Sequence, residues 1–251
     1  MIDFTQPPQF SEPQLVGEHN ANLSASTLRV LQGGSWKKQD TIILLPAAKM
    51  VPTKAALSWM GLMTPPNQRA PKIPQTAIIG AIGMEVGEAY SKSIEAILGH
   101  PDLSTYRFLL TIEHDNIPPQ DGLIKLLAQM EARPEFSCIS GLYWTKGPGG
   151  VPQIWGDARD PFPNYRPQPP DPNGGMVECQ GTGMGFALWR LEMFKDQRLR
   201  RPWFKTICDA GAGVGTQDLY GWSDFRKNGY RCAVACDVLV GHYDVNEDKV
   251  W

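Results

Sequence analysis

The hydrophobic pattern between residues 41 and 143 alternates between two kinds of segment. Continuous apolar runs, typical of buried strands, lie at 41–45, 76–82, 106–112 and 136–143. Apolar residues at the spacing of one helix face occupy 53–63, 85–98 and 121–132. Strands that alternate with helices in this way predict an α/β fold, with an open parallel sheet covered by helices on both faces.

The pattern changes after residue 146, where prolines become frequent. The segment 147–175 is so rich in proline that we expect a long loop or a mobile lid without regular elements. Beyond it the pattern predicts a strand at 183–189, helices at 191–197 and 218–228, and a last strand at 231–240. Gly229 suits the position just after a helix, where a left-handed backbone is common.

The apolar run 106–112 ends abruptly in the carboxylates of Glu113 and Asp115. Residues i and i+2 of a strand point to the same side, so these two carboxylates can converge on one cation. Hard divalent cations such as Mg²⁺ prefer oxygen ligands and share them with substrate phosphates. A polar strand end followed by a turn explains the same residues without a metal. The pair alone therefore does not indicate a metal site, and its interpretation depends on the other motifs of the chain.

Composition excludes several classes of protein. The chain has 251 residues, 42% of them hydrophobic, and its formal net charge of -2 gives no general sign of nucleic-acid binding. No run approaches the roughly 18 apolar residues of a membrane span. The polar N-terminus does not resemble a secretory signal. The 5 cysteines are scattered without zinc-ligand spacing, so we expect a reduced, cytoplasmic protein.

Several short motifs follow one another in a characteristic order. They are Glu113-His114-Asp115, Gly181-Thr182-Gly183-Met184-Gly185, Gln217-Asp218, Gly229-Tyr230 and Gly241-His242. In this order the chain resembles a family 2-type glycosyltransferase of the GT-A fold, over residues 40–244. The resemblance implies a Rossmann-like, mostly parallel sheet flanked by helices.

The resemblance also implies a division of the chain. We expect an N-terminal arm or cap at 1–38 and a single GT-A domain at 39–251. Within that domain we expect a nucleotide-binding half at 39–146, the proline-rich loop at 147–175 and an acceptor half at 176–251.

The activity that the resemblance implies is transfer of a sugar from a nucleotide-sugar donor, such as a UDP- or GDP-sugar, to an acceptor hydroxyl. A divalent metal, Mn²⁺ or Mg²⁺, would be held by Glu113, Asp115 and His242. Glu113 stands where the family has aspartate, so Asp115 is the main metal candidate. Oxygen ligands with one imidazole suit Mn²⁺ better than Ca²⁺. Taken alone, His242 is equally well explained as a histidine satisfied at a strand end.

The resemblance assigns Asp218 as the catalytic base of an inverting reaction. Its place at the start of a helix explains a carboxylate equally well, because the helix dipole stabilises negative charge there. Gln217 replaces the glutamate that usually precedes this aspartate. The donor-binding residues that the resemblance implies are Pro46, Ala47, Ala48, Glu85, Lys92, Glu113, His114 and Gly183.

Alternatives for the acceptor and for the activity stay open. One interpretation of the basic residues between 190 and 205, together with Trp203 and Phe204, is an anionic acceptor such as nucleic acid, lipid phosphate or an acidic glycan. A glycosyltransferase acting on modified nucleic-acid bases would fit, and a solvated helix end explains the same charges. The departures at Glu113 and Gln217 keep open a non-catalytic sugar- or nucleotide-binding homologue. Aromatic candidates for stacking on sugar rings are Trp144, Trp155 and Tyr165.

Overall fold

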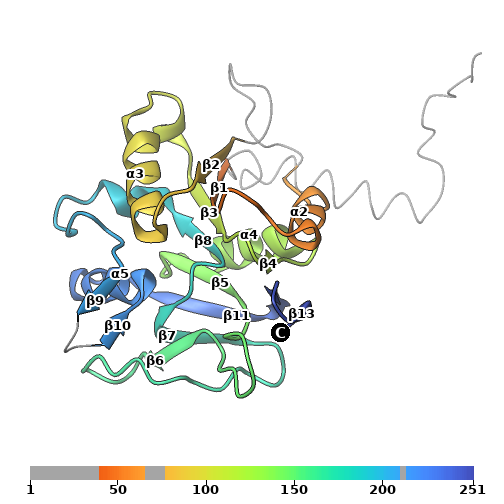
Figure 1. Cartoon of the computed structure of the whole chain (residues 1–251). Coiled ribbons are helices and arrows are strands. Elements are labelled where there is room, and N and C mark those ends of the chain that lie inside the picture. Colours follow the sequence, from red (N-terminus) through yellow and green to blue (C-terminus); the bar gives the residue numbers. More distant parts are fainter. Residues whose placement is uncertain (1–39, 66–76, 210–212) are drawn as a thin grey trace, which may run out of the picture.

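The chain is built around an eight-stranded sheet with the order β2-β1-β3-β8-β5-β11-β7-β6 (Figure 1). The computed structural model describes residues 40–65, 77–209 and 213–251, so the arm expected at 1–38 lies outside the described residues. The strands are β1 (Thr41–Ala47), β2 (Ile78–Ile82), β3 (Phe108–Ile112), β5 (Cys138–Leu142), β6 (Ile154–Asp157), β7 (Met176–Thr182), β8 (Phe186–Arg190) and β11 (Cys232–Leu239).

The sheet is mixed, but most of its strands run in one direction. β1 pairs in parallel with β2 and β3, and β5 pairs in parallel with β11. β8 is antiparallel to its neighbours β3 and β5, and β7 is antiparallel to β11 and β6. Only β8 and β7 therefore oppose the rest of this sheet. The predicted α/β fold with a mostly parallel, helix-flanked sheet is confirmed, although the strictly parallel order expected from residues 41–143 is interrupted by β8.

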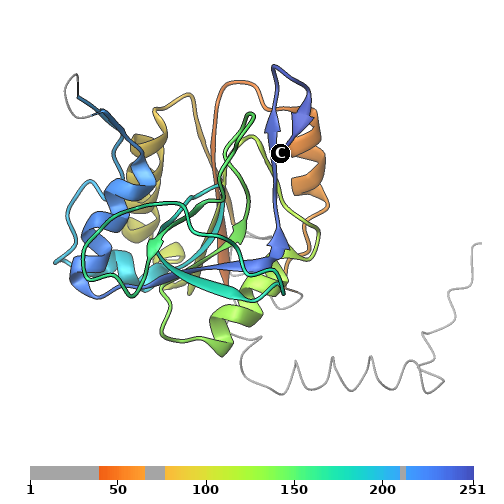
Figure 2. The same ribbon diagram turned by 90° about the horizontal axis from the view of Figure 1, so that it is seen from below.

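Helices cover both faces of the sheet (Figure 2). α3 (Val86–Gly99) and α5 (Gln217–Phe225) pack on one face, and α2 (Thr53–Met60) and α4 (Gly122–Ala132) pack on the other. β1 shows how the sequence separates the two layers. Its residues Ile42 and Leu44 enter the core beside α3, whereas Ile43 enters the core beside α4. Successive strand residues point to opposite faces, so an unbroken apolar run suits a strand buried on both sides.

An aromatic cluster fixes α5 against the sheet. The ring of Trp222 on α5 stacks on Trp189 of β8, with ring centroids 5.3 Å apart and an interplanar angle of 18°. The ring of Phe225 meets both indoles edge-on, and the ring of Phe204 meets Trp189 and Phe225 edge-on. These four side chains are almost completely buried. Because α5 also carries Gln217 at its start, this packing sets where the first turn of the helix projects.

Two small sheets complete the described chain. β4 (Asn116–Ile117), β12 (Gly241–Asp244) and β13 (Lys249–Val250) form one of them, with β12 in the middle. β9 (Ile207–Asp209) pairs with β10 (Gly213–Gly215) in the other. None of these short strands is predicted from the sequence, since two to four residues carry too little periodicity to be recognised.

The structure corrects three expected elements in the second half. The segment 147–175 is not without regular structure, because β6 lies inside it and pairs with β7, itself an unpredicted strand. The helix expected at 191–197 is a 3-10 helix over Leu191–Lys195. The helix expected at 218–228 is α5 followed by a 3-10 turn, Arg226–Asn228, and it ends as predicted at Gly229 with a φ of 87°.

The stacking of Trp222 on Trp189 leads to a prediction about stability. Trp222→Ala should lower the free energy of unfolding by about 3 to 5 kcal/mol, the usual cost of removing a fully buried aromatic side chain. Trp222→Phe should cost less than the alanine substitution, because phenylalanine keeps most of the buried aromatic volume, and the indole N–H of Trp222 has no hydrogen-bond partner to lose. Equilibrium urea denaturation measures both values. A loss below about 1 kcal/mol for the alanine variant would contradict this account of the core.

Candidate functional site

The acidic motif forms a turn between two strands. β3 ends at Ile112, and the backbone N–H of Glu113 donates to the oxygen of Gly185 at 3.0 Å. The N–H of Asn116, where β4 begins, donates back to the oxygen of Glu113 at 3.0 Å. The chain therefore turns at Glu113 and does not continue β3. Glu113 and Asp115 do not lie on one side of an extended strand, contrary to the prediction from the alternation of strand side chains.

The small sheet brings the C-terminal part of the described chain to this turn. His242 in β12 pairs with Asn116 in β4, and the N–H of Tyr243 donates to the backbone oxygen of Asp115 at 2.8 Å. The Nε2 atom of His242 lies 3.6 Å from Oδ2 of Asp115. Its Nδ1 atom lies 2.7 Å from the oxygen of Trp144, which can only accept, so Nδ1 carries a proton. Nε2 then offers the carboxylate a second proton in the imidazolium form, or offers a metal its lone pair in the neutral form.

Lys146 is the second basic partner of Asp115. Its Nζ contacts Oδ2 of Asp115, and both side chains are largely withdrawn from solvent. Burial alone would raise the pKa of Asp115, but hydrogen bonds from His242 and Lys146 outweigh it and hold that pKa below its usual value. Asp115 is therefore an ionised carboxylate placed between two basic side chains.

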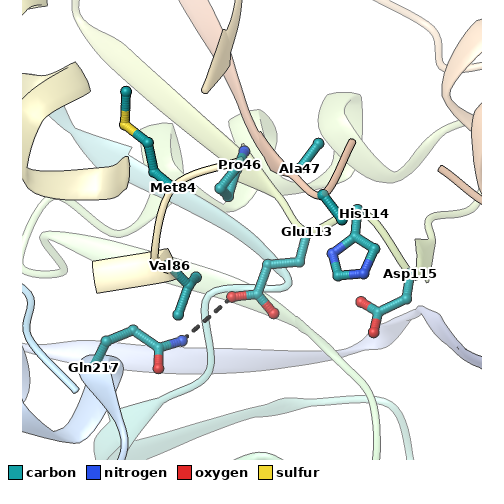
Figure 3. A pocket seen from close by; sticks show the side chains of 9 residues that line it. Pro46, Ala47, Met84, Val86, Glu113, His114, Asp115 and Gln217 are labelled. Atoms are coloured by element: carbon teal, nitrogen blue, oxygen red, sulfur yellow. Dashed lines mark hydrogen bonds between the residues drawn. The ribbon is translucent and has the colours of Figure 1, made fainter. Parts of the chain in front are cut away.

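Glu113 reaches instead toward α5 (Figure 3). Its Oε1 accepts a hydrogen bond from the hydroxyl of Tyr90 at 3.1 Å and another from Nε2 of Gln217 at 3.4 Å. Burial raises the pKa of Glu113 to about 7, and the nearby carboxylates of Asp115 and Asp218 add to this shift. Glu113 is thus a carboxyl group that changes its charge near neutral pH.

Two cavities meet at Glu113 and Gln217, which line both. The first has a volume of about 300 Å³, and its other lining residues are Pro46, Ala47, Ala48, Met84, Val86, His114 and Asp115. The second has a volume of about 360 Å³, and its further lining residues include Tyr143, Thr145, Gln153, Trp155, Asp218 and His242. They are adjoining chambers of one cleft, at the carboxyl ends of β1 and β3 where open α/β sheets bind ligands.

Asp218 lies in the second chamber at the start of α5. Its side chain is nearly buried, at 7% exposure, and its Oδ1 accepts from the N–H of Leu219 at 2.8 Å. Burial raises the pKa of Asp218, and hydrogen bonds from Thr216 and the backbone only partly offset this effect. A higher pKa makes a carboxylate a better proton acceptor, so the desolvated environment counters the helix dipole.

The donor set of Asp115 and His242 fits a divalent cation that takes its remaining ligands from a substrate. One carboxylate and one imidazole converge within 3.6 Å of each other beside the first chamber. Mg²⁺ and Mn²⁺ are commonly bound through few protein ligands together with phosphate oxygens. No group of three or more His, Cys, Asp or Glu side chains suited to a metal occurs in the part of the chain that the structure describes.

Some predicted donor-binding residues lie elsewhere. Glu85 caps α3 by accepting from the N–H of Glu88 at 2.9 Å, and Lys92 forms an ion pair with Glu88. Both line a separate cavity along α3. Gly183 lies so close to Tyr143 that a Cβ there would meet its hydroxyl at 2.1 Å, so this glycine permits close packing against that ring, and it lines neither chamber. The structure brings together Pro46, Ala47, Ala48, Glu113, His114 and Asp115.

Lys146 and Gln153 have no site role predicted from the sequence, whereas Trp155 is one of the aromatic candidates for stacking on a sugar ring. Lys146 lies between β5 and β6, and Gln153 and Trp155 lie in the segment expected to be an irregular loop. The half-buried Trp155 donates from Nε1 to Oε1 of Gln153 at 2.8 Å and lines the second chamber. Trp144 and Tyr165, the other aromatic candidates, pack against the core. No local motif marks these residues, because strand pairing alone brings them to the cleft.

The basic segment expected to attract an anionic acceptor is used within the fold. Arg190 donates to two backbone oxygens at 2.7 and 2.8 Å, and Arg198 pairs with a neighbouring carboxylate. Arg200 donates to a backbone oxygen of α5 at 2.6 Å. Trp203 and Phe204 are each only 1% exposed, so their rings cannot stack on bases. The two aromatic rings of this segment are therefore not available to a nucleic-acid acceptor.

Among the residues that the structure describes, no helix is both long enough and apolar enough to cross a bilayer.

The raised pKa of Glu113 predicts a pH-dependent contribution to stability. A carboxyl group whose folded pKa of about 7 exceeds the ordinary glutamate pKa of 4.5 favours folding at low pH, and that advantage is lost as the pH rises through about 7. Glu113→Gln cannot ionise and keeps an oxygen for Tyr90. In the presence of EDTA it should match the parent at pH 4.5 and exceed its stability by roughly 3 kcal/mol at pH 8.

Urea denaturation at a series of pH values measures this difference. Glu192→Gln, which changes an exposed carboxylate, is the matched control and should leave the pH profile unchanged. Parallel profiles for the parent and Glu113→Gln would show that Glu113 is not the desolvated group described here.

Comparison with known proteins extends only to the fold. The sequence matches no family model and no curated protein. The crystal structure of A197 from STIV aligns with a TM-score of 0.56 at 14% identity, over 84% of this chain and 92% of that one. GalNAc-T7, solved with UDP, GalNAc and Mn²⁺, aligns with a TM-score of 0.55 at 9% identity, over 96% of this chain and 55% of its own. The chain thus spans about half the length of that glycosyltransferase, and it has a glycosyltransferase-like GT-A fold.

Proposed function

We propose that this chain transfers a sugar from a nucleotide-sugar donor to an acceptor hydroxyl, as its resemblance to family 2-type enzymes implies. The observation that supports the proposal is the division of one cleft into two chambers at the acidic turn. Asp115 lines the first chamber, Asp218 lines the second, and Glu113 lies at their junction. A donor that spans the junction would present its sugar to an acceptor in the second chamber.

The nucleotide of the donor would occupy the first chamber. Its base would lie against the end of β1 at Pro46, Ala47 and Ala48, and its diphosphate would lie near Asp115. UDP- and GDP-sugars are the candidate donors, and the structural neighbour solved with UDP and Mn²⁺ supports a UDP-sugar. Asp115 and His242 would hold Mn²⁺ or Mg²⁺, which, when bound, neutralises charge on the departing diphosphate.

The acceptor would occupy the second chamber. Asp218, a nearly buried carboxylate with a raised pKa, would take the proton from the attacking hydroxyl. Attack from the face opposite the leaving group predicts inversion at the anomeric carbon. Trp155 would hold the apolar face of a sugar ring, while Gln153 fixes the indole through its hydrogen bond.

The proposal is tested by nucleotide release and product analysis. Purified protein incubated with a panel of UDP- and GDP-sugars and Mn²⁺ should release nucleotide faster when a suitable acceptor glycan is added, and NMR should show inverted anomeric configuration. Retained configuration would remove Asp218 from the role of base. Release of nucleotide from none of the donors, with no nucleotide binding in the presence of the metal, would instead favour a non-catalytic homologue.

Asp218→Asn should lower the rate of transfer by about 10²- to 10⁴-fold, because the amide cannot accept the proton. Donor binding should change little, since the first chamber does not include Asp218. Initial rates and donor affinity are measured on the same preparations. Asp237→Asn, at an exposed position of β11, is the matched control and should retain full activity. Near-parental transfer by the Asp218 variant would contradict the proposed base.

His242→Ala should reduce stabilisation by nucleoside diphosphate together with Mn²⁺. A ligand present at 100 times its dissociation constant stabilises the native state by about 2.7 kcal/mol, which a thermal-shift assay detects. We expect most of this shift to disappear in the variant, because one of two protein ligands for the cation is lost. An undiminished shift would place the metal, or the diphosphate, away from His242.

A further inference from the structure

Lys146 contacts the carboxylate oxygen of Asp115 that a bound cation would need. Its ammonium group contacts Oδ2 of Asp115, and the same Oδ2 is the oxygen that faces Nε2 of His242 at 3.6 Å. A divalent ion bound between Asp115 and His242 would lie against this oxygen. The ammonium group and the ion carry charge of the same sign, so they cannot both remain close to one largely buried carboxylate oxygen.

The turn that carries Lys146 is well defined. Trp144 forms a bridge with Pro152, and the N–H of Thr145 donates to the oxygen of Val151 at 2.9 Å. Gly147 has a φ of 95°, which glycine adopts without strain. The backbone on both sides of Lys146 is therefore held, whereas its four-carbon side chain can rotate away from Asp115 without any change in the fold.

The segment that carries Lys146 also orients His242. The backbone oxygen of Trp144, two residues before Lys146, accepts from Nδ1 of His242 at 2.7 Å. One short connection after β5 thus orients the imidazole and also delivers the competing ammonium group. His242 and Lys146 converge on Asp115 from segments about 100 residues apart in the sequence, and this geometry makes the carboxylate the shared target.

We propose that Lys146 is a built-in competitor for the divalent cation at Asp115. Its ammonium group binds the carboxylate in the protein without metal and must leave before Mn²⁺ or Mg²⁺ can bind between Asp115 and His242. The proposal rests on the cation site of the proposed function. It adds that Lys146 lowers the affinity of that site for the metal. In the absence of a donor, the metal therefore binds less tightly than it would bind to Asp115 and His242 without Lys146.

Removal of the competing charge should therefore strengthen metal binding. Lys146→Met keeps most of the length of the side chain and removes its charge. In titrations of Mn²⁺ alone, with free Mn²⁺ measured by electron paramagnetic resonance, we expect the variant to bind the ion at least about tenfold more tightly than the parent, a difference of about 1.4 kcal/mol. Lys146→Arg, which retains the charge, should not gain affinity.

Two further variants localise the effect. Lys125→Met removes a half-buried lysine of α4 that pairs with Asp121, the residue before this helix, and it should leave Mn²⁺ affinity unchanged. It controls for the general loss of one positive charge. Asp115→Asn introduced into the Lys146→Met protein should abolish the gain, because the carboxylate for which the two cations compete is then absent. Circular dichroism of each variant confirms that it is folded.

Equal Mn²⁺ affinity in the parent and Lys146→Met, including negligible binding by both, would overturn the inference. So would weaker binding by the methionine variant, which would make Lys146 a positioning residue for Asp115. If Lys146→Met does not fold, Lys146→Arg still tests the inference. This variant keeps the positive charge, so tighter Mn²⁺ binding by it would contradict competition between charges. The titration requires no donor and no turnover, so its result is separate from the nucleotide-release test of the proposed function.

Discussion

The pairing of β4 with β12 is the constraint on which the candidate site depends. It places His242 beside the turn that follows β3, and a backbone hydrogen bond from Tyr243 holds Asp115 in that turn. The two strands have only two and four residues, so local propensity does not stabilise them. They persist because β3 and β11, which lead into them, are buried in the main sheet. The stability of the core is therefore what sets the geometry of the cleft.

The electrostatic arrangement of the cleft follows from placing three carboxyl groups close together away from water. Ionisation of all three would be costly, because like charges repel strongly when they are desolvated. Asp115 stays charged because His242 and Lys146 face it, whereas Glu113 is driven toward its neutral form by burial. The protein thereby separates one strongly anionic position from two carboxyl groups with raised pKa values. Such separation is typical of sites in which neighbouring carboxyl groups have different roles.

This arrangement gives a physical explanation for Glu113 and Gln217, the two positions that differ from the glycosyltransferase pattern that the sequence resembles. Glu113 has a longer side chain than aspartate and uses it to reach the hydroxyl of Tyr90 and the amide of Gln217. Gln217 offers a donor where a glutamate would add a further negative charge to the junction. The two substitutions therefore complement each other: an uncharged amide at Gln217 meets a carboxyl group whose ionisation is suppressed. They alter the junction of the chambers and leave the Asp115–His242 pair in place.

Much of the fold could be predicted from local pattern. The sequence pattern predicts the four long strands and the three α-helices between residues 41 and 143 with errors of a few residues at their ends, because long apolar runs and helical spacing survive without tertiary context. The direction and position of β8 could not be predicted. A buried strand reads the same whether its neighbours are parallel or antiparallel, and β8 enters the sheet from a distant part of the sequence. β6 was missed because prolines on both sides hide a short strand that depends on its pairing with β7.

The sequence by itself determined the chemical groups of the site: an acidic motif after a buried strand, an aspartate at a helix start and a histidine after the last long strand. Their distinct roles were decided only by the tertiary structure. The turn gives Glu113 and Asp115 different partners, and these partners decide their pKa shifts. Burial raises the pKa of Glu113, whereas His242 and Lys146 outweigh burial at Asp115 and lower its pKa. Lys146 entered the site without any sequence signal. The reason is that the distance between two charges and the water around them depend on how remote segments pack, and neither quantity is encoded in local order.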